Sequence, residues 1–102
     1  MMPYEETVEK FKKVLKLDPD NIQIWTSWGV ALVELKQFEK AAEKFQKAVE
    51  LQPDFVPALY GWGIALKAQG KEEEAAEKFQ KAAEIDTATQ DLPNSEHTQR
   101  PV

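Results

Sequence analysis

The chain has 102 residues, with 13 Lys or Arg, 18 Asp or Glu, a formal net charge of -5 and no cysteine. This length suits one domain or a short run of repeats. Nucleic acids and anionic membranes attract positive protein surfaces, so the acidic balance argues against both as the main partner. Without cysteine the chain forms neither disulfides nor thiolate metal sites.

The first six residues, Met1 to Glu6, lack the basic stretch and apolar core of a signal peptide. The apolar runs are far shorter than a membrane-spanning helix requires. We therefore expect a cytoplasmic protein that does not insert into a membrane.

The first predicted element is a helix over residues 4–18. Its apolar residues recur at helical spacing and share one face, while Glu and Lys fill most other positions. This face consists of Val8, Phe11, Val14 and Leu15.

Two further helices are predicted over residues 21–35 and 38–51. Asp20 or Asn21 can cap the first of them, and Pro53 ends the second. Both carry an apolar stripe at steps of three and four residues. The stripes consist of Trp25, Trp28, Leu32 and Leu35, and of Ala41, Ala42, Phe45, Ala48 and Val49.

The last two predicted helices cover residues 56–69 and 72–85. Pro57 falls in the first turn of the former, where no amide partner is lost, and Gly70 supplies the turn between them. Residues beyond 87 include Pro93 and Pro101 and little that is apolar. We expect them to form a flexible tail.

The chain repeats itself at an offset of 34 residues. This shift aligns Trp28-Gly29 with Trp62-Gly63, and residues 41–48 with the identical residues 75–82. It also aligns Phe11 with Phe45. A fixed offset of this length indicates a helix–turn–helix repeat whose copies stack on one another.

The repeat resembles the tetratricopeptide repeat (TPR) family over about residues 3–87. Three positions depart from the family pattern: Lys36 replaces a turn glycine, Glu72 an aromatic residue and Thr87 the closing proline. The matching positions are Trp25, Gly29, Ala41, Phe45, Ala48 and Pro53 in one copy, and Leu59, Gly63, Gly70, Ala75, Phe79 and Ala82 in the next.

The resemblance implies an all-α fold, a right-handed α-solenoid of antiparallel helix pairs with about two and a half repeats and five helices. Residues 1–20 form the second helix of an incomplete unit. Complete repeats follow at residues 21–54 and 55–87, and residues 88–102 are the tail. The implied function is a protein–protein interaction scaffold.

No motif points to catalysis. The lone histidine, His97, lies in the tail and has no second imidazole or thiol with which to bind a metal. Trp28 and Trp62 follow an apolar helical spacing, which favours a place in the core over ligand stacking. We therefore expect no enzyme activity, no cofactor and no metal.

In this family the leading helix of each repeat lines a concave groove that binds a peptide or helix of a partner protein. The Lys and Asn of members that clamp a C-terminal carboxylate are not present, because Thr26 and Val30 occupy such positions. We predict a more apolar ligand with Tyr60 as its anchor; the alternative is a vacant groove. The corresponding positions are Gln23, Thr26, Val30, Val33, Pro57, Tyr60, Ile64 and Lys67.

The unpaired ends suggest an alternative function. The first helix lacks its own partner, so Val8, Phe11, Val14 and Leu15 are candidate self-association residues. Another copy of the chain could cover them, giving a homo-oligomer. The other explanation is that the sequence is one segment of a longer solenoid.

Overall fold

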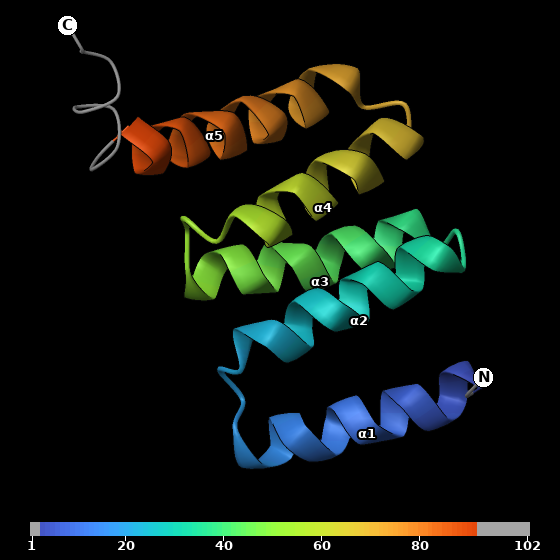
Figure 1. The fold of residues 1–102 in the computed structure, drawn as a ribbon. Coiled ribbons are helices and arrows are strands. Elements are labelled where there is room, and N and C mark those ends of the chain that lie inside the picture. Colours follow the sequence, from blue (N-terminus) through green and yellow to red (C-terminus); the bar gives the residue numbers. More distant parts are fainter. Residues whose placement is uncertain (1–2, 92–102) are drawn as a thin grey trace, which may run out of the picture.

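The computed structural model describes residues 3–91, with side chains through residue 88, and this part of the chain contains five helices and no strand. Each helix runs antiparallel to the one before it, and the first and last of the five helices lie at opposite ends of the stack (Figure 1). The helices are α1 (Tyr4–Leu17), α2 (Ile22–Glu34), α3 (Phe38–Leu51), α4 (Val56–Ala68) and α5 (Glu72–Asp91).

The predicted helix boundaries are confirmed to within one residue for α1 to α4. Asn21 caps α2, since its side-chain oxygen accepts a hydrogen bond from the Ile24 amide at 3.1 Å. Pro57 lies in the first turn of α4. These local signals fix where the helices begin, as the sequence predicts.

The predicted end of α5 is wrong, because the helix continues from residue 85 to Asp91. Helix α3 ends at Leu51, two residues before Pro53, whereas Thr87 occupies the equivalent position in α5. A threonine keeps its backbone amide and does not block the next turn, so the helix continues. The predicted tail, residues 88–102, therefore begins inside α5, and residues 92–102 and His97 lie outside the described part of the chain.

The turns within the two repeats have the same hydrogen bonds although their sequences differ. The Gln37 amide donates to the Leu32 carbonyl, and the Lys71 amide donates to the Leu66 carbonyl, both at 2.9 Å. This bond requires the residue before the donor to adopt a left-handed conformation. Lys36 has φ 62° and Gly70 has φ 84°. The lysine therefore adopts the conformation that glycine adopts in the second repeat.

The core centres on Phe45 of α3, which is 1% exposed. Its ring lies against two glycines, Gly29 of α2 and Gly61 of α4. A Cβ atom at Gly29 would approach the Phe45 ring to 2.7 Å, and a Cβ at Gly61 would come closer still. The two glycines thus let α2 and α4 close over the same ring. Leu32, Ala41, Ala48, Ala58 and Ala65 complete the buried cluster.

Helix α1 differs from the others because it has no buried residue. It contacts α2 through Trp28, whose Nε1–H donates to the Tyr4 hydroxyl at 3.0 Å. The Phe11 and Trp28 rings lie 6.0 Å apart. Trp28 of α2 therefore contacts two aromatic residues of α1, Tyr4 and Phe11.

Candidate protein-binding surface

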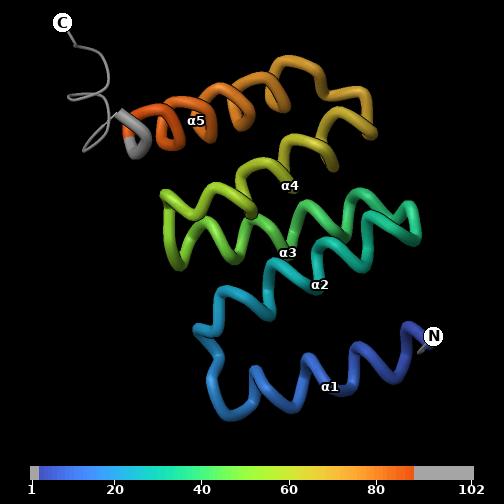
Figure 2. The backbone as a smooth tube through the Cα atoms, in the orientation of Figure 1, coloured from blue at the N-terminus to red at the C-terminus, as the bar shows by residue number. Residues whose placement is uncertain are grey.

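Alternate helices of the stack differ sharply in charge. Helices α2 and α4 each carry one charged residue, Glu34 and Lys67 respectively, whereas Glu and Lys are frequent in α1, α3 and α5. Helices α2 and α4 also run in the same direction along the stack (Figure 2). The surface that they share is nearly free of charge in a chain that is 30% charged residues.

This shared surface, here called the α2–α4 groove, consists of Val30, Val33, Tyr60 and Ile64. Val30 is 46% exposed, Tyr60 40% and Ile64 49%. Exposed apolar side chains that gather on two neighbouring helices are not needed for a solvated helix face and are typical of a binding surface. The sequence-predicted positions thus include a contiguous apolar set on the first helices of the two repeats.

A pocket of about 270 Å³ lies in this groove between α2 and α4. It brings together three sequence-predicted residues, Val30, Val33 and Ile64. Phe45 and Gly61 also line it, and Glu34 is its one charged lining residue. Gly61 was not predicted, because Ser27 occupies its position in the first repeat and the repeat pattern therefore gives no signal for it.

The other predicted groove residues have different environments. Gln23, Pro57 and Lys67 are exposed. Thr26 is buried, and its hydroxyl donates to the Ile22 carbonyl at 2.9 Å, so its polar group already has a partner within α2. The Tyr60 ring lies 6.1 Å from the Phe79 ring of α5. Tyr60 therefore covers part of the core as well as facing solvent.

The candidate self-association residues on α1 are partly covered. Val8, Phe11 and Leu15 are half-buried, and Val14 is 36% exposed. Leu17, which is not among these candidates, is 88% exposed at the end of the helix. The structure thus leaves some apolar surface on α1 in solvent, although α2 covers part of the predicted face.

The aligned tryptophans pack against the core, as predicted, and a lysine covers each of them. The Lys44 ammonium lies 4.1 Å from the centre of the Trp28 ring, and Lys78 lies 4.1 Å from Trp62. Trp28 and Trp62 are both half-buried and contact the buried cluster. In each cation–π pair a lysine already covers one face of the tryptophan ring, so we do not assign Trp28 and Trp62 to ligand binding.

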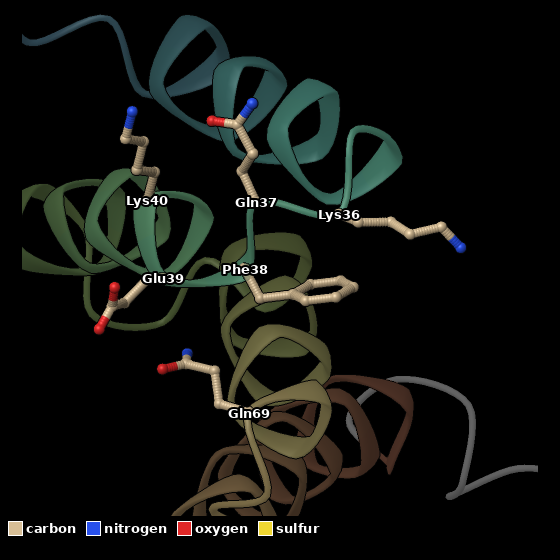
Figure 3. A pocket seen from close by; sticks show the side chains of 6 residues that line it. All are labelled: Lys36, Gln37, Phe38, Glu39, Lys40 and Gln69. Atoms are coloured by element: carbon tan, nitrogen blue, oxygen red, sulfur yellow. The ribbon is translucent and has the colours of Figure 1, made fainter.

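A wider depression of about 530 Å³ lies at the turn between α2 and α3. Phe38, Gln69 and the flanking Lys36 and Lys40 line it. Figure 3 shows that the two lysine side chains extend in different directions, so their charges do not converge on one point. This depression is more polar than the α2–α4 groove and offers no paired cations for an anion.

Two other features are absent from the described part of the chain. No cluster of three or more His, Cys, Asp or Glu side chains in it could hold a metal ion. No helix in it combines the length and apolar character needed to cross a membrane.

These features define a tetratricopeptide-type α-solenoid, right-handed and made of stacked antiparallel helix pairs. The family model described as the middle TPR-like domain of cilia and flagella-associated protein 70 matches residues 7–100. The chain therefore belongs to this TPR-like family.

Solved structures of MamA have the same fold. The structure titled "MamA MSR-1 C2" has a TM-score of 0.76 and 30% identity over 84% of this chain. "MamA D159K mutant 2" has a TM-score of 0.75 and 31% identity over 82% of this chain. This chain covers 49% and 46% of those two chains, about half their length. Comparison with curated protein sequences gave no match.

Proposed function

We propose that the chain is a non-enzymatic interaction module that binds a peptide or helix of another protein in the α2–α4 groove. The fold and family support a scaffold role in general. The observation that carries the specific proposal is the pocket of about 270 Å³ between α2 and α4, bordered by Val30 and Ile64. A cytoplasmic site of action, expected from the sequence, belongs to the same proposal.

The physical argument concerns the solvent exposure of aliphatic side chains. Val30 and Ile64 are each about half exposed, so a partner can still cover a substantial part of their surface. Burial of one large apolar side chain contributes about 1.5–3 kcal/mol. A partner segment that covers this pocket therefore gains affinity without any change in the fold of the stack.

The test is affinity capture from a lysate of the source organism, followed by titration of the purified partner against variants. Ile64→Lys is the informative substitution, because Ile64 lines the pocket and its exposure leaves room for the lysine to reach solvent. Tyr60→Ser is less informative, since Tyr60 also contacts Phe79. We expect Ile64→Lys to weaken binding at least tenfold with unchanged helicity by circular dichroism. Unchanged affinity would exclude the groove.

The second candidate function is self-assembly through the end helices. It is favoured by the absence of any buried residue in α1 and by the 88% exposure of Leu17. Sedimentation velocity over a dilution series distinguishes the two functions. A monomer at tens of micromolar contradicts self-assembly, whereas an oligomer that Val14→Lys dissociates supports it.

A further inference from the structure

The distribution of charge along the α2–α4 groove restricts the chemistry of its ligand. Glu34 is the last residue of α2, and Lys67 is the penultimate residue of α4. Because the two helices run in the same direction, both charges lie at one end of the groove (Figure 1). Glu34 also lines the pocket that Val30 and Ile64 border, whereas Val30, Val33, Tyr60 and Ile64 themselves carry no charge.

A charged ligand side chain in the middle of this groove would lose water without gaining a partner. Such burial of an unpaired charge is strongly unfavourable, and the cores of protein interfaces are accordingly depleted of Lys, Glu and Asp. The groove therefore discriminates against segments that are charged along the stretch that crosses it. It tolerates charge only at the end that carries Glu34 and Lys67.

The pocket also limits the size of what can enter it. Small-molecule sites usually have volumes of about 300–1,000 Å³. At about 270 Å³, the pocket between α2 and α4 is smaller than that range. Phe45 is fully buried and Gly61 lies against it, so the pocket cannot deepen without moving the core. One large apolar side chain is the natural occupant.

We infer that the partner segment inserts one large aliphatic or aromatic side chain between Val30 and Ile64, and that it carries no charge across the groove except beside Glu34 and Lys67. This inference rests on the proposed function, since it specifies the ligand of the same groove. It is carried by the near absence of charge on α2 and α4 and by the one-side-chain pocket with its Phe45 and Gly61 base.

The inference is tested by selecting displayed random 12-residue peptides on the intact protein and on two variants. Ile64→Lys places a cation at the pocket. Leu35→Lys is the matched control, because Leu35 is 45% exposed, close to the 49% of Ile64. Leu35 does not line the pocket, and it lies about 200° around the helix from Val33. Val30→Lys replaces Ile64→Lys if circular dichroism shows that the latter is unfolded.

We expect the unmodified protein and Leu35→Lys to select the same sequences, with one large apolar residue and no acidic residue beside it, because Glu34 lines the pocket. Ile64→Lys should fail to select them. Replacing the apolar residue of a selected peptide by Ala should weaken binding at least tenfold, and adding Glu beside it should have a similar effect.

Other results would contradict the inference in separable ways. A consensus that lacks the large apolar residue, or that has acidic residues beside it, and that Ile64→Lys abolishes would overturn the ligand chemistry but leave the groove as the binding site. No enrichment, or a consensus that Ile64→Lys retains, would overturn the inference and the proposed function together. Self-association of the unmodified protein that Ile64→Lys dissociates would identify the occupant as a second copy and also overturn the inference.

Discussion

A phenylalanine at the same repeat position is buried to a different extent in the interior of the stack and at its ends. Phe11, Phe45 and Phe79 occupy one repeat position in α1, α3 and α5. Phe45 is fully buried because helices on both sides present glycine to its ring. Phe79 is half-buried, and so is Phe11. Burial in this chain therefore depends on which neighbours a helix has, as expected when each repeat contacts only adjacent repeats.

The largest test of this comparison is truncation of the equivalent phenylalanines. Phe45→Ala should lower the free energy of unfolding by about 3–5 kcal/mol, since it leaves a cavity in the core. Phe79→Ala should cost about 1–2 kcal/mol because part of that ring is already in solvent. Urea unfolding followed by circular dichroism measures both losses. If Phe45→Ala does not fold, Phe45→Leu and Phe79→Leu give the same ranking. Equal losses would contradict the difference between interior and end.

The second test concerns Gly61, which lies against Phe45 of the preceding repeat and has no glycine counterpart in the first repeat. In Gly61→Ala the added methyl group would come closer to the Phe45 ring than van der Waals contact allows, so the ring or the helix would have to shift. We expect a net loss of about 1–2 kcal/mol after allowing for the better helix propensity of alanine. Ser27→Ala at the same repeat position is the control, because Ser27 is exposed. It should change stability by less than about 0.5 kcal/mol, and a loss equal to that of Gly61→Ala would refute the explanation.

A smaller effect should follow from exchanging the residues of the two turns. Lys36→Gly should stabilise the chain by about 1 kcal/mol, since glycine adopts a positive φ without steric cost. Gly70→Lys should destabilise it by a similar amount. A Cβ atom at Gly70 would meet no atom within 4 Å, so we attribute the expected effect to the backbone conformation. Thermal unfolding of both variants measures this difference. Shifts of the same sign would show that the turns are not equivalent.

The smallest effect is expected at the lysines that cover the tryptophans. Lys44→Gln and Lys78→Gln should each cost about 0.5 kcal/mol, because both ammonium groups lie 4.1 Å from a ring centre. Lys81→Gln, at an exposed position of α5, provides the control. The denaturant midpoints of unfolding of the three variants are compared with that of the unmodified protein. Indistinguishable midpoints would mean that the lysine–tryptophan pairs contribute nothing to stability.

Much of the fold could be predicted from the sequence because its signals are local. Asn21, Pro53 and Gly70 mark where helices start and stop, and the structure confirms them. The length of α5 was predicted less accurately than the lengths of the other four helices. Thr87 removes the expected stop, and a missing stop signal does not reveal how far a helix continues.

The candidate site was less predictable because it depends on contacts between helices. The family resemblance placed Val30, Val33 and Ile64 among the groove positions, and these residues do line one pocket. Periodicity could not show that Thr26 is buried or that Gly61 lies against Phe45. Both features depend on how closely neighbouring helices approach each other. The residue pattern of a single helix contains no information about that distance.

The attachment of α1 has a consequence for how the molecule opens. Its release breaks the hydrogen bond from Trp28 to Tyr4 and separates Phe11 from Trp28, but it uncovers no fully buried side chain of its own. Local opening of a weakly packed element requires less free energy than global unfolding. Amide exchange should therefore be faster in α1 than in α3. The chain will then have two opening free energies, one for its first helix and a larger one for the remaining four.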